Sequence, residues 1–257
     1  MGCRYLGLVA AAIACFPLSG LRAEPGDGAP AKESESSAAV SFRHDVIALA
    51  VHEKGTTDFA TGSVFEFRNA HYLVTARHFA REREMRMVAV FSRDSTHGMR
   101  VPVENLKSEG SQWTHFSDVD LSVLKVRQDH ELVKTVTGRH LPEVTEDSGL
   151  TTLSPVTLIG VPLLYGVSEN TGVSPTVIRT SVANASVRLS KADPPVHLYL
   201  FPVDLPAGFS GGVVVDAKAS PNQILRGVII RNTVDEKGGQ FSIAVPSEVL
   251  ARLLLVP

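Results

Sequence analysis

The chain has 257 residues, of which 44% are hydrophobic and 20% are charged, and its net charge at pH 7 is −2. This composition is that of a globular protein with enough apolar side chains for one large core or two smaller ones. Because the charge is nearly balanced, no basic surface points to a nucleic-acid partner, and no acidic run suggests a solvated tail.

Residues 1–23 have the pattern of a secretory signal peptide. Arg4 supplies a positive n-region, an apolar run extends from Leu6 to Phe16, and Ala23 ends a possible cleavage site. The apolar run is too short to span a bilayer, so no stable membrane span is expected. We therefore predict export, with a mature chain that begins at Glu24.

Both cysteines, Cys3 and Cys15, lie inside this segment. The mature protein would therefore contain no disulfide, and export without disulfides favours a bacterial periplasmic or secreted location. Lipidation of Cys15 is the alternative, although Ala12 stands three residues before it, where Leu is usual.

Residues 24–40 are rich in Gly, Pro, Ser and Glu and are predicted to form a flexible linker. From residue 41 onward, short apolar runs alternate with turn residues, which is typical of strands. The predicted strands cover residues 45–51, 62–67, 72–75, 87–91, 121–126, 156–159, 181–189, 196–201, 212–215, 225–230 and 241–245. Arg68–His71 is expected to form the turn of a hairpin.

The regular spacing of these runs predicts an all-β fold of the barrel or sandwich kind. The polar segment 128–152 has little strand signal and is expected to cross between two halves, at about 41–130 and 150–257. Helical signals are few, but Ser247-Glu248 after Pro246 can cap a short C-terminal helix over residues 249–256.

Three short patterns carry side chains that could do chemistry together. Leu73–His78 is an apolar strand that ends on a histidine, Asp120 opens the run 121–126, and Ser210 lies among glycines in Gly208–Gly212. A serine hydroxyl needs a base to take its proton, histidine is that base near neutral pH, and a carboxylate fixes its tautomer. Glycines let the backbone turn sharply, so the N–H groups of Gly208 and Ser210 are expected to face a developing oxyanion.

In this order, the three patterns resemble the trypsin/chymotrypsin superfamily, and more closely its bacterial HtrA-type and glutamyl-endopeptidase-like branches. The resemblance covers about residues 60–250. It implies two antiparallel six-stranded β-barrels, followed here by the short helix, which leaves no room for the PDZ domain that HtrA-type enzymes usually carry. It also implies a serine endopeptidase that hydrolyses proteins or peptides through an acyl-enzyme, with His78, Asp120 and Ser210 as catalytic triad and with no cofactor or metal.

The order of histidine, aspartate and serine along the chain distinguishes this hypothesis from the folds of other serine hydrolases. The Gly208–Gly212 pattern also fits the nucleophile elbow of lipases, but that fold needs its histidine after the serine, and the last histidine here is His197. Subtilisin order needs an aspartate before the histidine, which Asp45 or Asp58 could supply, but the sequence offers no parallel α/β pattern to hold it.

Other polar residues near these motifs have simpler interpretations. Asp118 is the alternative to Asp120, although it lies outside the apolar run. We expect His71 in a hairpin turn and His115 in a polar loop. His52 is followed by Glu53 but lacks the second histidine of a helical zinc site.

Phe209 departs from the superfamily pattern. Trypsin-like zymogens carry an aspartate at this position, which pairs with a new N-terminus after an activating cut. The resemblance therefore predicts an enzyme that needs no such cut. The alternative is a catalytically silent pseudoprotease that binds a peptide or protein partner. It follows if the unusual Phe209 leaves the loop 201–209 in a conformation that cannot stabilise the oxyanion.

The resemblance also suggests a substrate-binding region. Asp204 lies six residues before Ser210, where trypsin-like enzymes set their preference for Arg or Lys, and Ile230, Arg231 and Asn232 are predicted to contact substrate beside it. Arg231 could neutralise Asp204. HtrA-type enzymes prefer small aliphatic residues, so a solvated loop acid at Asp204 is the alternative interpretation.

Overall fold

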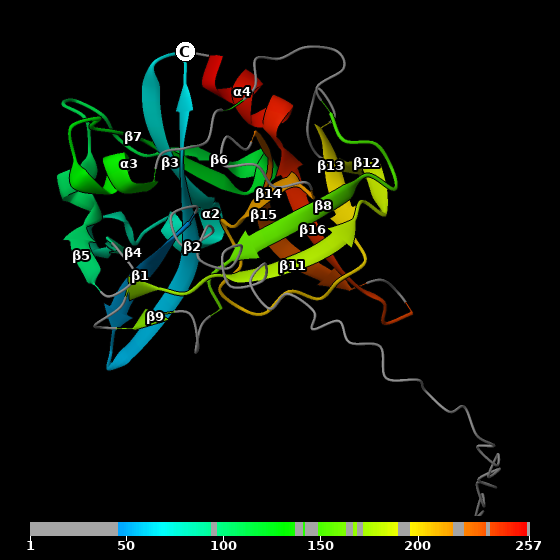
Figure 1. Cartoon of the computed structure of the whole chain (residues 1–257), viewed down its shortest axis with the longest axis horizontal. Coiled ribbons are helices and arrows are strands. Elements are labelled where there is room, and N and C mark those ends of the chain that lie inside the picture. Colours follow the sequence, from blue (N-terminus) through cyan, green and yellow to red (C-terminus); the bar gives the residue numbers. More distant parts are fainter. Residues whose placement is uncertain are drawn as a thin grey trace, which may run out of the picture. The chain divides into compact units, whose positions relative to one another are not determined.

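The computed structural model describes residues 46–93, 97–136, 141, 149–162, 167–168, 172–189, 196–217, 224–234 and 237–255. The predicted signal peptide and linker lie outside the described residues. Strands dominate the described part and form two antiparallel seven-stranded sheets and one small two-stranded pair (Figure 1). The prediction of an all-β fold with two chymotrypsin-like barrels is confirmed, with seven strands in each sheet where six were expected.

The first sheet has the strand order β5-β4-β1-β2-β3-β7-β6. Its strands are β1 (Ile47–Glu53), β2 (Thr56–Phe67), β3 (Ala70–Ala76), β4 (Val88–Ser92), β5 (Gly98–Pro102), β6 (Thr114–Phe116) and β7 (Leu121–Val126). The β2–β3 hairpin turns on Arg68 and Asn69, whose φ angles of 48° and 60° suit a two-residue hairpin loop. His71, expected in this turn, instead lies in β3, opposite Glu66 of β2.

The second sheet has the strand order β11-β8-β14-β15-β16-β13-β12. Its strands are β8 (Pro155–Gly160), β11 (Thr176–Ser181), β12 (Asn184–Leu189), β13 (Val196–Phe201), β14 (Val213–Asp216), β15 (Leu225–Val234) and β16 (Gln240–Pro246). The prediction of a single strand over residues 181–189 is wrong. The chain turns at Val182 and Ala183, which bond to Ser154 and Leu200 and so divide the run between β11 and β12.

Short elements complete the described chain. The small pair is β9 (Val167–Ser168) with β10 (Gly172–Val173), and the helical segments are α2 (Arg77–Ala80), η2 (Glu84–Arg86), η3 (Val103–Leu106), η4 (Ser117–Val119), α3 (Glu131–Val136) and α4 (Ser247–Leu255). The C-terminal helix is confirmed, two residues earlier than predicted. No helix in the described ranges is both long and apolar enough to cross a membrane.

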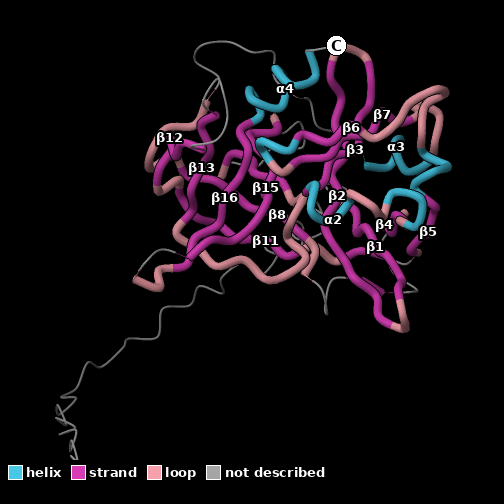
Figure 2. Tube along the Cα trace, turned by 180° about the vertical axis from the view of Figure 1, so that it is seen from behind, coloured by secondary structure: helices cyan, strands magenta, loops and turns pink. Residues whose placement is uncertain are grey.

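Three apolar clusters explain why these strands form. One cluster fills the first sheet around Leu49 and Phe91, and a second fills the other sheet around Tyr199 and Phe209. The third joins side chains of both sheets and holds them against each other. Figure 2 shows the two sheets side by side from behind, with α2 near the centre of the view. Strands β3, β7 and β14, which adjoin the three motifs of the candidate site in the sequence, all contribute side chains to this third cluster.

Candidate active site

His78 and Asp120 lie against each other at the end of one strand pair. Ala76, the last residue of β3, is opposite Leu121, the first of β7, and the ladder extends one step further as Arg77 N–H donates to Asp120 O at 2.8 Å. His78 follows in α2, so the register of β3 and β7 brings the histidine beside the aspartate.

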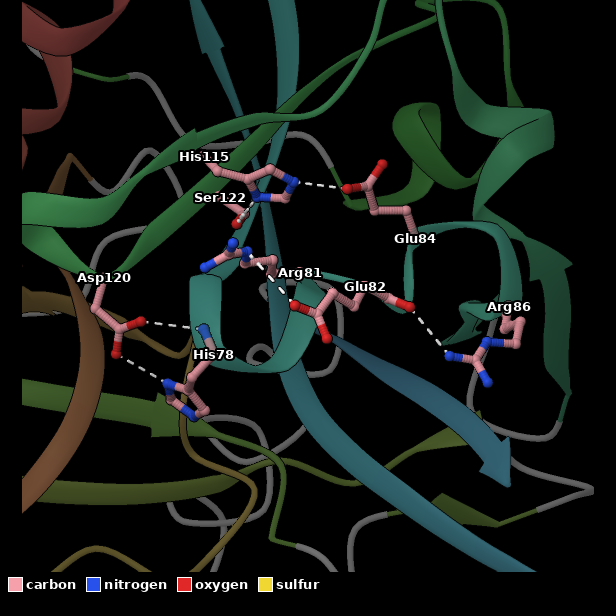
Figure 3. A network of polar contacts seen from close by, with 8 residues as sticks. All are labelled: His78, Arg81, Glu82, Glu84, Arg86, His115, Asp120 and Ser122. Carbon is pink, nitrogen blue, oxygen red and sulfur yellow. Dashed lines mark hydrogen bonds and ion pairs between the residues drawn. The ribbon is translucent and has the colours of Figure 1, made fainter. Parts of the chain in front are cut away.

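Both carboxylate oxygens of Asp120 accept a hydrogen bond from His78. The backbone N–H of His78 donates to Oδ1 at 3.0 Å, and its ring Nδ1 lies 2.9 Å from Oδ2 (Figure 3). The two bonds fix the position and the rotation of the imidazole, and they leave Nε2 as the ring nitrogen that faces away from the carboxylate. The His78 side chain is 50% exposed, whereas that of Asp120 is 22% exposed.

Asp120 has a left-handed backbone, with φ of 54° and ψ of 39°. Aspartate adopts this conformation more readily than most residues, but it still costs energy. A strained residue held by its surroundings is common at functional sites. Asp118, the alternative acid, is exposed in η4 and accepts a bond from Ser117 Oγ at 3.2 Å. The structure therefore brings Asp120, and not Asp118, to His78.

Ser210 lies in a compact loop between β13 and β14. The loop begins with a turn in which Phe209 N–H donates to Pro206 O at 3.3 Å and Gly208 has a φ of 98°. A positive φ at the third residue is the requirement of a type II turn and favours glycine. The loop ends as Gly212 N–H donates to Phe209 O at 2.8 Å.

Gly211 lets this loop approach the first sheet. A Cβ on Gly211 would lie 1.9 Å from Thr61 O and 2.6 Å from Thr75 Oγ1. Thr61 also donates its N–H to Ser210 O at 2.9 Å. Because Thr75 lies three residues before His78 on the same strand end, these contacts bring the backbone of Ser210 close to the segment that carries His78.

The amide groups of the loop divide into two sets. Phe209, Gly211 and Gly212 donate their N–H groups to backbone carbonyls. Among the described residues, none accepts a hydrogen bond from the N–H of Gly208 or Ser210. These two amides are the pair expected to stabilise an oxyanion, and they remain available for a ligand.

Phe209 is 2% exposed and packs into the core of the second sheet. Its ring lies against Gly160 at the end of β8, where a Cβ would come within 2.6 Å of Phe209 Cδ1. The residue before Ser210 is thus held by apolar packing.

The predicted substrate-binding residues take different positions. Ile230 is 1% exposed and its side chain belongs to the core, whereas Arg231 is exposed. Asp204 is exposed and accepts a bond from Asn232 Nδ2 at 2.7 Å. No ion pair joins Arg231 to Asp204 in the described part of the chain.

Asn232 has four polar contacts that cross this region. Besides Asp204, its Nδ2 donates to Leu205 O at 2.6 Å, and its Oδ1 accepts from Ser242 Oγ at 2.8 Å and from Leu205 N–H at 3.4 Å. The side-chain amide is therefore fully used within the protein, and it ties β15 and β16 to the loop that leads to Ser210.

The structure reveals a second polar cluster that the sequence did not predict. His115, expected in a loop, lies in β6, where Nδ1 is 2.6 Å from Ser122 Oγ and Nε2 is 2.6 Å from Glu84 Oε1 (Figure 3). Ser122 is fully buried, so it is not available as a nucleophile. Instead, Glu84 and His115 link the segment after His78 to the strand that follows Asp120. The pairing of β6 with β7 places His115 opposite Ser122, but no local pattern in the sequence indicates the contact with Glu84, 31 positions away.

The described ranges contain no cluster of three or more His, Cys, Asp or Glu side chains that could hold a metal ion. The groups that the site itself offers are the Ser210 hydroxyl, the His78 imidazole, the Asp120 carboxylate and two backbone amides.

No family model matches the sequence, and no curated protein does. Solved structures do match. Rv3671c from M. tuberculosis H37Rv, a protease in an inactive form, is 16% identical, with a TM-score of 0.53 over 87% of this chain and 91% of its own. The HtrA-type protease AlgW with a tripeptide is 16% identical, with a TM-score of 0.52 over 84% of this chain. A serine endoprotease from Yersinia pestis is 15% identical, with a TM-score of 0.51 over 84% of this chain.

This chain spans 62% of the AlgW chain and 64% of the Yersinia chain, but most of the Rv3671c chain. At such low identity, the likeness concerns the course of the backbone. The chain therefore has the two-barrel fold of trypsin-like serine proteases, the HtrA type among them.

Proposed function

We propose that this protein is a serine endopeptidase in which His78, Asp120 and Ser210 form the catalytic triad. The observation that carries the proposal is the two-point hydrogen bonding of Asp120 to His78, beside a glycine-rich loop that bonds through Ser210 O to Thr61, in the strand that pairs with β3. The fold, which the chain shares with known serine proteases, supports the same conclusion. Its substrates would be proteins or peptides, with no nucleic-acid partner.

The proposed reaction follows from the hydrogen bonds that the ring nitrogens of His78 and the amides of the Ser210 loop already make. Nδ1 of His78 is engaged by Asp120, so Nε2 takes the proton as Ser210 Oγ attacks the substrate carbonyl carbon. The N–H groups of Gly208 and Ser210 donate to the carbonyl oxygen as it becomes negative. His78 then gives its proton to the leaving amine. Water, deprotonated by the same imidazole, attacks the acyl carbon; the ester bond to Ser210 Oγ then breaks, and the imidazolium returns its proton to that oxygen.

Labelling by a fluorophosphonate, which reacts with activated serines, tests this function. The wild-type protein should take up the label and hydrolyse a denatured protein substrate, whereas Ser210→Ala should do neither. Turnover should fall by about 10⁶-fold in Ser210→Ala and in His78→Ala, and the two losses should not add, because the residues act as one unit. If the wild type neither reacts nor hydrolyses, the pseudoprotease alternative stands in its place.

We further propose that the protein is exported to the periplasm or the medium, with Glu24 as its mature N-terminus. The charged n-region at Arg4, the short apolar run and Ala23 support this. Mass spectrometry of the protein from its natural host should give a mass that starts at Glu24. Retention of Met1, or a lipid on Cys15, would contradict the proposal.

A further inference from the structure

Thr61 has an unusual position between the two sheets. It lies in β2 of the first sheet and is fully buried. Its hydroxyl donates to Gly208 O at 2.7 Å and accepts from Val161 N–H at 2.9 Å. Its own N–H donates to Ser210 O at 2.9 Å, and its carbonyl accepts from Thr75 Oγ1 at 2.8 Å. One residue of the first sheet thus contacts the Ser210 loop twice.

These contacts fix whole peptide groups of the loop. In the Gly208–Phe209 peptide, Thr61 Oγ1 holds the carbonyl and Pro206 O holds the N–H. In the Ser210–Gly211 peptide, Thr61 N–H holds the carbonyl and Ile229 O holds the N–H. Each peptide plane is therefore fixed at both ends, so neither can rotate without breaking two hydrogen bonds.

A third peptide of the loop is held in the same way. Ser63, two residues along β2, donates its hydroxyl to Gly211 O at 2.8 Å, and Gly212 N–H donates to Phe209 O at 2.8 Å. Ser63 is 1% exposed, so this bond is also shielded from water. The first sheet thus holds the carbonyls of three residues, and the orientation of the loop depends on two hydroxyls of β2.

We infer that Thr61 is a positioning residue that orients the N–H groups of Gly208 and Ser210 for the oxyanion, an inference that rests on the proposed serine protease function. The Gly208 carbonyl and the Gly208 N–H are joined through one Cα whose φ is 98°. Fixing the carbonyl to Thr61 therefore limits the rotation of the N–H on the other side. The hydroxyl also holds Val161, which directly follows Gly160, the residue that receives the Phe209 ring.

The chemistry of the side chain suggests the variants. The Thr61 hydroxyl donates one bond and accepts one, so Thr61→Val keeps the shape and loses both. Thr61→Ser keeps the hydroxyl. Ser92→Ala is a matched control, because Ser92 is also a buried hydroxyl residue, with 1% of its surface exposed. Its hydroxyl donates to Val173 O at 3.0 Å and accepts from Val173 N–H at 2.9 Å, and neither bond involves the Ser210 loop.

Steady-state kinetics on a peptide substrate, with melting temperatures, tests the inference. Removing one oxyanion donor costs about 10²–10³ in kcat, so misorienting the pair in Thr61→Val should lower kcat by roughly 10- to 100-fold. KM should change little, and the pH midpoint of kcat/KM should stay, because His78 and Asp120 are untouched. Thr61→Ser should restore most of kcat. Ser92→Ala should lower the melting temperature and leave kcat near that of the wild type.

Two results would overturn the inference. In the first, Thr61→Val keeps the wild-type kcat; in the second, Ser92→Ala loses as much kcat as Thr61→Val at an equal loss of melting temperature. If Thr61→Val does not fold, Ser63→Ala replaces it, because it removes only the bond to Gly211 O. It should still lower kcat, and an unchanged kcat would count against the inference.

A structural measurement separates this inference from the proposed function. If the wild-type protein proves inactive, the protease function fails, and crystal structures of wild type, Thr61→Val and Thr61→Ser judge the positioning alone. Rotation of the Gly208 peptide in Thr61→Val, but not in Thr61→Ser, would support the role of the hydroxyl. A Gly208 φ that stays near its wild-type value of 98° in Thr61→Val would refute it.

Discussion

The ring of Phe209 occupies the space that the absent side chain of Gly160 leaves. A Cβ on Gly160 would lie 2.6 Å from Phe209 Cδ1 and 2.7 Å from Cγ. Phe209 is 2% exposed, so this contact lies inside the core of the second sheet. Apolar burial thereby sets the position of the residue before Ser210, in place of the ion pair with a new N-terminus that trypsin-like zymogens use.

We predict that the protein needs no activating cut beyond removal of the predicted signal peptide. Phe209 is buried among apolar side chains of the second sheet, so a chain that begins at residue 41 should be as active as one that begins at Glu24. Comparing kcat/KM of the two purified proteins measures this. Activity that arises only after a further cut near the first sheet would contradict it.

Gly160→Ala should lower activity indirectly, by displacing Phe209, the residue before Ser210. The new methyl group would collide with the Phe209 ring, and such overpacking costs about 1–3 kcal/mol in the free energy of unfolding. Activity should fall together with stability, and Phe209→Leu in the same chain should recover part of both. Urea unfolding and kcat measure these effects. Gly149→Ala is the control, because its Cβ would meet no ring or backbone atom more closely than 3.7 Å: its nearest neighbours are the flexible tip of Glu248, at 3.2 Å, and the Tyr199 hydroxyl, at 3.7 Å.

Asp120→Asn should lower kcat by about 10⁴-fold. The carboxylate accepts a hydrogen bond from Nδ1–H and so leaves Nε2 free to take the serine proton, whereas an amide can donate to Nδ1 and hold the imidazole in the wrong tautomer. Asp118→Asn is the matched control, since Asp118 is exposed and, within the described ranges, bonds only to its neighbour Ser117. It should keep kcat within about twofold of the wild type, as surface substitutions do. Equal losses in the two variants would remove Asp120 from the proposed triad.

Local pattern was sufficient to predict most of the fold. Alternating apolar residues identified the central strands, and the short helix after Pro246 followed from its cap. Short strands such as β5 and β6 were missed, because three to five residues with mixed polarity carry little periodic signal. The run 181–189 was misjudged because its break at Val182 and Ala183 depends on backbone bonds to distant strands.

The candidate site was likewise predicted only in part from the sequence. Residues that carry chemistry, such as His78 and Ser210, stand in recognisable local motifs. The residues that hold them do not. Thr61 contacts Gly208 across 147 positions of sequence, and His115 contacts Glu84 across 31. Such contacts depend on the packing of the sheets, which no local pattern reveals.

Tyr199 should make the stability of the fold sensitive to alkaline pH. Its hydroxyl donates to Glu248 Oε1 at 3.1 Å and accepts from Leu150 N–H at 2.8 Å. Burial, and then the Glu248 charge, raise the pKa of Tyr199 well above its usual value of 10.0. In the unfolded chain the phenol ionises near pH 10 while the folded one stays neutral, so stability is full below pH 10 and falls as the pH rises further.

Tyr199→Phe tests this interaction. The variant loses both hydrogen bonds and leaves Leu150 N–H without a partner, which should cost about 1–3 kcal/mol in the free energy of unfolding at neutral pH. Its loss of stability between pH 9 and 11, measured by urea unfolding, should be less steep than that of the wild type. Equal slopes for wild type and Tyr199→Phe would show that the phenol does not contribute.

Cleavage specificity should not depend on Asp204. The carboxylate is exposed and already accepts a bond from Asn232, so water screens it and a substrate cation would gain little there. We therefore expect no preference for Arg or Lys before the scissile bond, and the same cleavage profile in Asp204→Ser as in the wild type. Asn232→Ala should be more harmful, because it breaks the contacts with Leu205 and Ser242 that support the loop before Ser210. Cleavage-site profiling on a denatured proteome, with kcat/KM of each variant, measures both effects. A wild-type preference for Arg or Lys that disappears in Asp204→Ser would instead make Asp204 the specificity determinant.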